Sequence, residues 1–394
     1  MANDVFTIKD NVTVEFLIPS PGTFIWGVNN WDDGGVWDSN PTSEAWTNLA
    51  CETFDIDIEK GCELESGIFV QPSSSVAKIR MQGVTYDPFS NSAIHPGTQV
   101  RIMIEPNPDT SPGSQIAIWQ GSVRNFSASY NQKGNNIITI NAVDAMQDFL
   151  NTKVASYVVP ALANYPGNVL SDLANTYYTG LSGNINPDVY YLAAKTYTNT
   201  TVGEIVQDCL TAGLGALWID RDGTMNYRSE QDLTEIANTF SFNFSTTHET
   251  TSGTHICMTD LVMKADSRDL PNEVIATYTG GSSLTLRNQD AFDLYGAISL
   301  SVTVPIDNSG GTQLWLDRLN LTTKLRRVES LTFDAMQRSG QLWDWWLADR
   351  IFDPNIVGYS INGIDFSETY FVTKQKDRIT PSSWDITIEL WRGI

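Results

Sequence analysis

The stretch between residues 119 and 150 constrains the fold of this chain more than any other part of the sequence. Residues 138–141 read Ile-Thr-Ile-Asn, so apolar and polar side chains alternate as on a half-buried strand. The polar residues 131–136 before them favour a turn, and they follow the segment Trp119-Gln120-Gly121. We therefore expect an antiparallel hairpin that turns at residues 131–136.

The pattern changes from strand to helix at Asp144. Apolar side chains then recur at helical spacing, and Asp144 with Gln147 three residues later has the form of a capping box. We expect the second strand of the hairpin to run directly into a short capped helix.

The charge of the chain is strongly acidic, with a net value of -22. Residues 1–65 hold thirteen Asp and Glu against two Lys and no Arg, which is half of that charge. Binding to DNA or RNA depends on cations that neutralise phosphates, so the composition argues against an ordinary nucleic-acid-binding protein. Charge of this sign also keeps a protein soluble by self-repulsion.

The apolar runs are too short to span a bilayer, so we expect no membrane insertion. Residues 1–4 carry neither a basic segment nor an apolar core, and a secretory signal is not expected. The four cysteines lie far apart without a Cys-x-x-Cys pair, which indicates folding in a reducing cytoplasm. Cys209 falls on the apolar face of an expected helix and is interpreted as a buried residue.

The pattern divides the chain into three expected domains: residues 1–152, 153–262 and 263–394. The first contains short alternating segments separated by Gly and Pro, as in an antiparallel sandwich or barrel, and Gly61 is one of the residues expected to separate strands. Its expected strands are 12–18, 53–58, 76–81, 99–104, 115–119 and 137–141.

The middle part is expected to be a small α+β domain. An apolar stripe predicts a helix over 169–177, and a capping box formed by Thr201 and Glu204 predicts a second helix that ends at Gly213 or Gly215. A hairpin is expected to turn at Asp222-Gly223, and the Thr-, Ser- and Asn-rich residues 236–262 are expected to form a loop or linker. In the last part, the expected strands are 273–279, 284–286, 298–304, 329–333, 370–375 and 385–391, and the expected helices are 290–295, 313–327 and 342–351.

Candidate metal sites are weak. Asp220-Arg221-Asp222-Gly223 begins like a calcium loop but lacks the remaining ligands, so a tight turn explains it better. His248, His255 and Cys257 lie close in sequence but match no zinc-finger spacing, and exposed histidines in a polar loop are the simpler interpretation. No motif of a known nucleophile or metalloprotease occurs, and we expect no catalytic residue, metal or cofactor.

Three tryptophans flank an acidic segment near the N-terminus: Trp26, Trp31 and Trp37. Aromatic rings beside acids can bind sugars, but aromatic side chains are also enriched where protein subunits meet. We favour an arm that packs on a neighbouring subunit.

An ordered set of motifs extends over nearly the whole chain. Besides the Trp119-x-Gly121 strand and its capped helix, the set comprises 46–49, 56–61, 75–83, 86–88, 96–102, 201–223, 272–275, 295–296 and 327–332. In this order the motifs resemble those of phage tail hub proteins, which are often described as minor tail proteins of actinobacterial siphophages. The chain departs from that family at residues 61–65, where the family has a glycine and an arginine after its second strand.

The resemblance implies a mainly β protein with an α+β insertion, composed of two antiparallel β-barrel hub domains and a small α/β domain. Three copies would form a ring at the virion tail tip, made in the host cytoplasm, that joins the hexameric tail tube to the tip. The implied partners are two further copies, the distal tail protein, the tape measure protein and tip or receptor-binding proteins. The alternatives are a tail-associated cell-wall hydrolase and a carbohydrate-binding host-recognition protein.

The implied ring also gives the acidic charge a second interpretation, because a channel lined with carboxylates lets DNA pass without specific binding. Asp55, Asp57 and Glu59 alternate along one expected strand, so they share one face of it. We expect all three to face solvent and to line the ejection channel, with Ile56 and Ile58 on the opposite, core-facing side.

Overall fold

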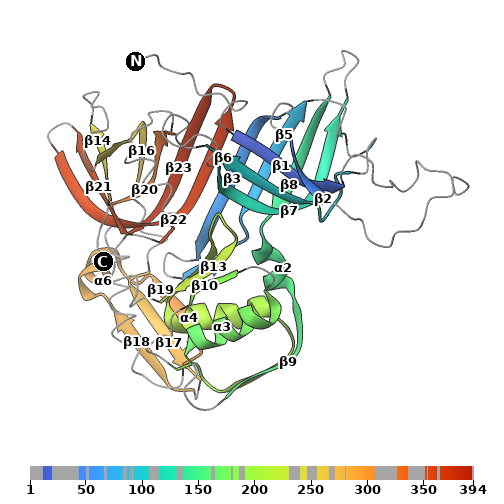
Figure 1. Cartoon of the computed structure of the whole chain (residues 1–394). Helices are drawn as coiled ribbons and strands as arrows, with labels where there is room; N and C mark the ends of the chain where they lie inside the picture. The colour runs from blue at the N-terminus through green and yellow to red at the C-terminus, as the bar shows by residue number, and fades with distance from the viewer. Residues whose placement is uncertain are drawn as a thin grey trace, which may run out of the picture.

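The computed structural model of the 394-residue chain describes residues 12–19, 44–49, 53–65, 69–82, 87, 89, 93–105, 115–130, 136–160, 165–178, 181–185, 191–229, 240–245, 255–265, 271–279, 281–306, 326–335, 351–352, 354–361 and 364–392. Long strands form an upper β layer, and helices with shorter strands form a lower body beneath it (Figure 1).

The first half of the upper layer is antiparallel, with strand order β3–β5–β8–β7–β6–β1–β2. Its strands are β1 (Val12–Pro19), β2 (Glu44–Asn48), β3 (Thr53–Glu65), β5 (Val76–Gln82), β6 (Gln99–Ile104), β7 (Ile116–Ser129) and β8 (Ile137–Val143), and β4 (Phe69–Pro72) pairs with the end of β3. On β8, Ile138 and Ile140 are buried and Thr139 is half-buried. The hairpin expected from residues 119–141 is confirmed as β7 and β8.

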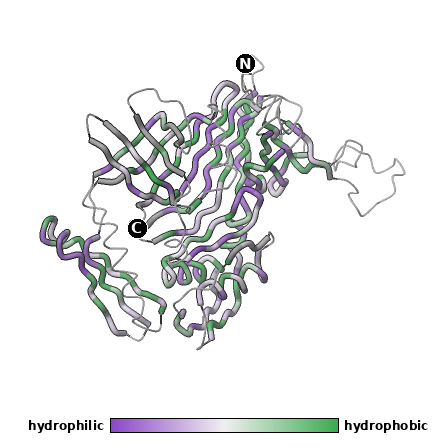
Figure 2. The backbone as a smooth tube through the Cα atoms, turned by 60° about the vertical axis from the view of Figure 1, so that its left-hand side comes forward, coloured by the Kyte–Doolittle hydropathy of each residue, from purple (hydrophilic) through white to green (hydrophobic). Residues whose placement is uncertain are grey.

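The second half comprises β14 (Phe240–Ser245), β15 (His255–Cys257), β16 (Asp260–Ala265), β20 (Arg326–Asp334), β21 (Pro354–Ile361), β22 (Ile364–Thr380) and β23 (Ser383–Arg392). The central strand is β22, whose 17 residues pair with β21 at one end and with β23 towards the other. β22 also pairs with β3, so the two halves make a single sheet of 15 strands. Hydrophobic and hydrophilic residues alternate along many of these strands (Figure 2).

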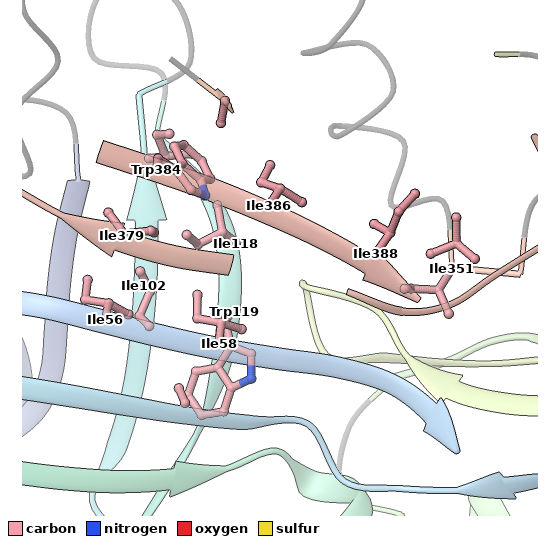
Figure 3. Packing of buried hydrophobic residues seen from close by; sticks show 14 of the residues in the cluster. Ile56, Ile58, Ile102, Ile118, Trp119, Ile351, Ile379, Trp384, Ile386 and Ile388 are labelled. Atoms are coloured by element: carbon pink, nitrogen blue, oxygen red, sulfur yellow. The ribbon is translucent and has the colours of Figure 1, made fainter. Parts of the chain in front are cut away.

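One hydrophobic core runs through both halves of this sheet. Ile56, Ile58 and Trp119 of the first half belong to the same buried cluster as Ile379 and Trp384 of the second half (Figure 3). Each of these side chains is at most 2% exposed. Burial of apolar surface therefore stabilises the contact between the two halves as well as each half.

The described residues of the lower body include four helices: α2 (Ala145–Asn151), α3 (Pro166–Tyr177), α4 (Val202–Gly213) and α6 (Gln289–Tyr295). Its strands form a two-stranded ribbon, β9 (Lys153–Val159) with β11 (Lys195–Thr201), and two three-stranded sheets: β10 (Leu181–Ile185) with β13 (Thr224–Arg228) and β12 (Ala216–Ile219), and β18 (Ser283–Arg287) with β17 (Glu273–Tyr278) and β19 (Ser299–Val304). The expected helix caps are confirmed: Asp144 accepts from the Met146 N–H, and Thr201 accepts from the Glu204 N–H.

A second hydrophobic core fills this lower body. It combines residues of α3 and α4 with Val274 and Ala276 of β17, which come from the part of the chain expected to form the last domain. The expected division into residues 1–152, 153–262 and 263–394 stays a prediction, and β17–β19 pack in this core with the helices that precede them.

Two expectations about local structure were wrong. Residues 236–262 were expected to be a loop, but they contain β14, β15 and the start of β16, because Phe240, Phe242 and Phe244 alternate with polar residues as strand residues do. Gly61 was expected to separate strands, but it lies inside β3. Of the expected helix 313–327, residues 313–325 lie outside the described residues and residues 326–327 belong to β20.

The fold is mainly β and antiparallel, as expected, with an α+β part beneath the sheet. Among the strands that the structure describes, the pairing does not return on itself to close a barrel.

Candidate functional site

The two halves of the upper sheet meet where β3 pairs with β22, and we call this pairing the seam. It runs antiparallel from Ile56 opposite Ile379 to Gly61 opposite Lys374. Gly61 has a φ of +119°, and a Cβ atom there would clash with the Thr373 carbonyl oxygen and lie 2.8 Å from Lys374 Cα. Only glycine allows the two backbones to approach this closely in this conformation.

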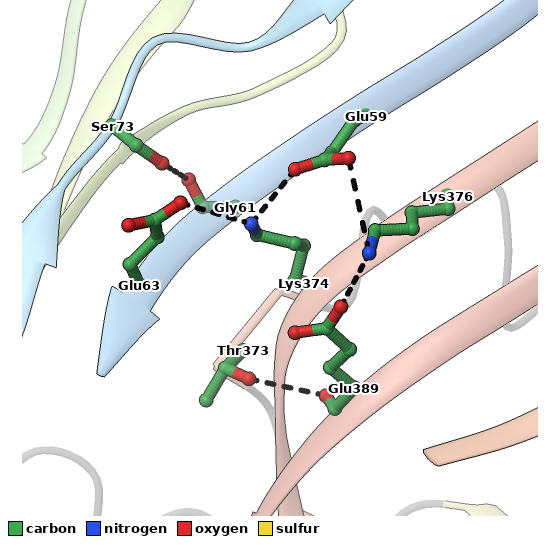
Figure 4. A network of polar contacts seen from close by, with 8 residues as sticks. All are labelled: Glu59, Gly61, Glu63, Ser73, Thr373, Lys374, Lys376 and Glu389. Carbon is green, nitrogen blue, oxygen red and sulfur yellow. Dashed lines mark hydrogen bonds and ion pairs between the residues drawn. The ribbon is translucent and has the colours of Figure 1, made fainter. Parts of the chain in front are cut away.

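A polar network crosses the seam beside Gly61 (Figure 4). Lys374 Nζ lies 2.7 Å from Glu59 Oε1 and 3.3 Å from Glu63 Oε1. Lys376 Nζ lies 2.6 Å from Glu389 Oε1 on β23 and 3.9 Å from Glu59 Oε2. Glu59 therefore lies between two lysines of β22, and the network joins three strands.

The Lys374 side chain is only 11% exposed, whereas Glu59 is 41% exposed. Burial by itself would lower the pKa of Lys374, but the hydrogen bond and charge of Glu59, with Glu389 and Glu63, outweigh it and raise the pKa. A raised lysine pKa means that this stabilisation is complete below the pKa of unfolded lysine and is lost only as the pH rises through the folded value. Lys374 is therefore charged at neutral pH.

Asp55 and Asp57 precede this network on β3, and both form ion pairs with Arg80 of the neighbouring strand β5. Arg80 contacts the Asp55 carboxylate closely, and its Nη2 lies 3.4 Å from Asp57 Oδ2. The Asp55 side chain is 10% exposed and that of Asp57 is 40% exposed. The expectation that all three β3 carboxylates face solvent is therefore wrong for Asp55, because its ion pair with Arg80 is largely buried.

The Trp119-Gln120-Gly121 motif lies on β7, and each residue has a different role. Trp119 is buried in the upper core. Gly121 leaves room for that ring, because a Cβ at position 121 would lie 2.5 Å from Trp119 Cη2 and would also clash with the Val143 carbonyl oxygen. Gln120 Nε2 donates a hydrogen bond to the Asp222 carbonyl oxygen, so the motif also ties the upper sheet to the lower body.

The hairpin that Gln120 contacts is formed by β12 and β13, and it turns at Gly223, whose φ is +83°. This confirms the expected tight turn. The Asp220 carboxylate accepts hydrogen bonds from Trp218 Nε1 at 2.7 Å and from Asn226 Nδ2 at 2.6 Å. The hydroxyl of Tyr178 donates to the Gly223 carbonyl oxygen at 2.7 Å, which fixes the turn from the other side.

Cys62 makes a second link between the sheet and the lower body. It follows Gly61 on β3, and its thiol donates to the Leu217 carbonyl oxygen of β12 at 3.0 Å. Burial raises the pKa of this thiol to about 12, so Cys62 is a neutral donor at physiological pH. Cys209 is fully buried in the lower core, as expected.

Asp144 connects the hairpin of β7 and β8 to the lower body. Its carboxylate accepts from the backbone N–H groups of Met146 at 3.1 Å and of Ser75 at 2.9 Å. Burial raises the pKa of Asp144 to about 6, although those N–H groups oppose the shift. The same side chain thus caps α2 and fixes the entry to β5.

Some expected site residues fall outside the described residues, namely Trp26, Trp31, Trp37 and His248. His255 and Cys257 were expected in a polar loop, but they lie in β15. Within the described ranges, no three His, Cys, Asp or Glu side chains gather as metal ligands would. No helix in the described part of the chain is long and apolar enough to span a membrane.

No protein-family model matches the sequence, and no curated protein matches it. The tail protein from Neisseria meningitidis is 12% identical over 97% of this chain and 96% of that one, with a TM-score of 0.62. The 43 kDa tail protein of prophage MuSo2 from Shewanella oneidensis is 10% identical over 97% and 98% of the two chains, with a TM-score of 0.58.

The chain therefore has the fold of a phage tail protein over nearly its full length. The resemblance that the ordered motifs predicted is confirmed at the level of fold. The narrower expectation of an actinobacterial siphophage stays a prediction.

Proposed function

We propose that this chain is a structural hub of a phage tail tip, and that three copies form a ring that joins the hexameric tail tube to the tip. The observation that carries the proposal is the match of 97% of the chain to a tail protein, with a TM-score of 0.62. A fold that spans the whole chain leaves little of it for a separate catalytic unit.

The division of the sheet into halves supports the ring. Among the described strands, the first half contributes eight strands and the second half seven, and the seam joins them within one chain. Three copies would present six such halves around an axis, which is the geometry needed to match a sixfold tube to a threefold tip. The seam would then carry load between neighbouring halves, through backbone hydrogen bonds, shared apolar core and the Lys374 network.

The acidic charge fits a channel through which DNA passes without specific binding. Glu59 and Asp57 are the candidates for its wall, since their side chains are 41% and 40% exposed. Asp55 is too buried to take part directly. Carboxylates on the wall would repel phosphates. DNA binding to the wall would then gain no free energy from counterion release.

In this role the partners are the distal tail protein on the tube side, the tape measure protein within the tube and tip or receptor-binding proteins beyond the ring. The place of action is the tail tip of the virion. The function requires neither a cofactor nor a catalytic residue, because the ring acts by holding its neighbours in register around the channel.

Native mass spectrometry of the purified protein tests the ring. We expect a species of three times the chain mass of 43.7 kDa. Proteomics of purified virions provides the second arm, in which the protein should be present. A monomer at every concentration, or absence from virions, would overturn the proposal.

A further inference from the structure

The β12–β13 hairpin, residues 216–228, belongs to both hydrophobic cores of the molecule. Side chains alternate along β12, so Ala216 and Trp218 lie in the upper core, whereas Leu217 and Ile219 lie in the lower core. All four are at most 6% exposed. Figure 1 shows β13 where the upper layer meets the lower body. The hairpin is therefore a wall that the two bodies share.

The backbone of β12 contacts one side of the seam. Cys62 directly follows Gly61, which ends the pairing of β3 with β22. The Cys62 thiol donates to the Leu217 carbonyl oxygen at 3.0 Å, and the residue is 2% exposed. The thiol is thus enclosed between the end of the seam and β12.

The next residue of β12 contacts the other side of the seam through Phe352. The ring of Trp218 packs against that of Phe352, and the ring centroids lie 5.5 Å apart. The Phe352 N–H donates to the Val372 carbonyl oxygen of β22 at 2.8 Å. Val372 directly precedes Thr373, whose carbonyl oxygen lies against Gly61. Two neighbouring residues of β12 therefore reach the two sides of the seam at the same end.

Phe352 has a backbone conformation that its surroundings must maintain. Its φ is +60°, in the left-handed region that a bulky residue enters at an energetic cost, and it is fully buried. Arg228 of β13 donates from Nη1 to the Phe352 carbonyl oxygen at 3.4 Å, and its guanidinium lies 5.4 Å from the centre of the Trp218 ring. Loss of the hairpin would remove these contacts and favour relaxation of Phe352.

We infer that the β12–β13 hairpin is a latch on the seam: in place it holds β3 and β22 together at the Gly61 end, and when displaced it lets them separate there. The latch can be released from a distance, because the hairpin is also anchored in the lower body. Leu217 and Ile219 lie in the lower core, and the Tyr178 hydroxyl donates to the Gly223 carbonyl oxygen. A partner that pulls on the lower body would thus loosen the joint between the halves without binding at the seam. The latch acts within one copy, so it does not depend on the proposed ring.

The reactivity of Cys62 tests the latch, because its thiol reaches solvent only when the hairpin moves. The native protein is treated with N-ethylmaleimide, and peptide mass spectrometry follows the modification of Cys62 separately from the other cysteines. Trp218→Leu keeps β12 apolar but removes the ring that packs on Phe352. We expect Cys62 to react about tenfold faster in this variant than in the wild type. Hydrogen exchange of the seam amides, residues 56–61 and 374–379, should accelerate with it.

Two further variants separate the latch from general destabilisation. Phe16→Leu also removes a buried ring from the upper core, but on β1, which pairs with β2 and β6 and not with the seam strands. It should leave Cys62 and the seam amides protected. Arg228→Met removes the hydrogen bond to Phe352 from a half-buried side chain, so it tests the same contact if Trp218→Leu does not fold. It should accelerate both signals by a smaller factor.

Unchanged reactivity of Cys62 in the hairpin variants that fold would overturn the latch. An equal increase in Phe16→Leu would also overturn it, since the effect would then follow from lost stability alone. Faster modification of Cys62 with unchanged exchange at the seam would show that the hairpin covers the thiol without holding the strands together, and it would overturn the latch as well.

Discussion

Lys374 Nζ lies 2.7 Å from Glu59 Oε1, although the two residues are 315 positions apart in the chain. Their ion pair crosses the seam between the halves of the upper sheet, directly beside the close approach of Gly61 to Thr373 (Figure 4). The last strands of the chain thus complete the sheet that the first strands begin. In a ring-forming hub, the seam would hold the two halves of each copy together.

The first prediction concerns Lys374. Lys374→Met should lower the free energy of unfolding by about 2 kcal/mol, because Glu59 and Glu63 lose the buried cation that pairs with them. A fully buried pair would cost more, and the exposure of the glutamates reduces the effect. Urea denaturation at constant m-value measures it. The control is Lys195→Met. Lys195 is 51% exposed and pairs with Asp208, so this variant should lose less than about 1 kcal/mol. Equal losses in the two variants would contradict the role of the network.

The second prediction concerns the backbone of the seam. Gly61→Ala should cost about 2 kcal/mol more than Gly97→Ala, because both glycines have positive φ but only position 61 has backbone atoms in the way of a Cβ. At Gly97 nothing lies within 4 Å of that Cβ. Chemical denaturation of both variants separates the cost of the backbone clash at position 61 from the cost of placing alanine at a positive φ. A smaller loss for Gly61→Ala than for Gly97→Ala would show that β22 moves aside easily.

The sequence predicts most single elements of this fold but not the seam. The alternation of residues 138–141 and the capping residues Asp144 and Thr201 act over a few positions, so their signals are local and were confirmed. The pairing of β3 with β22 depends on residues hundreds of positions apart, and no local pattern predicts which strands will meet. The polar residues between Phe240, Phe242 and Phe244 led to the prediction of a loop, although the alternation of apolar and polar residues is that of a strand.

The third prediction uses the pH dependence of Asp144. Its pKa is raised to about 6 in the folded state, so the folded protein holds a proton that the unfolded chain has released between about pH 4 and 6. The contribution of Asp144 to stability therefore falls by roughly 3 kcal/mol as the pH rises through this window. Above the window the contribution is constant.

The variant Asp144→Asn isolates this effect because asparagine does not titrate. We expect it to be destabilised at every pH, since its amide would place a donor against the N–H of Ser75 or Met146. The stability advantage of the wild type should shrink as the pH rises from 4 to 6, measured by urea denaturation at each pH. An advantage that grows over this range would mean that the helix cap favours the charged carboxylate more than burial opposes it.

The candidate site shows where the sequence was less informative. Alternation placed Asp55, Asp57 and Glu59 on one face of β3, but it could not show that Arg80 of β5 would bury Asp55. Lys374 and Lys376 were not identified, although their spacing puts both on one face of β22. Their importance depends on Glu59 and Glu389, which belong to other strands.

The fourth prediction tests the channel wall. Asp57→Lys should slow DNA ejection from virions at low salt, because the new cation would bind phosphates, and the delay should ease as salt screens it. The control is Asp385→Lys at an exposed position of β23, which tests whether any added cation has this effect. Ejection kinetics at several ionic strengths measure both. Unchanged kinetics in Asp57→Lys at every ionic strength would place this face of β3 away from the channel.

Electron cryo-microscopy of the virion tail tip tests the central claim most directly. We expect three copies of this chain around the tail axis, with six sheet halves in one ring beneath the tube and a seam of β3 with β22 inside each copy. A map in which the protein lies away from the tip, or in which the copies do not form a closed ring around the channel, would contradict it.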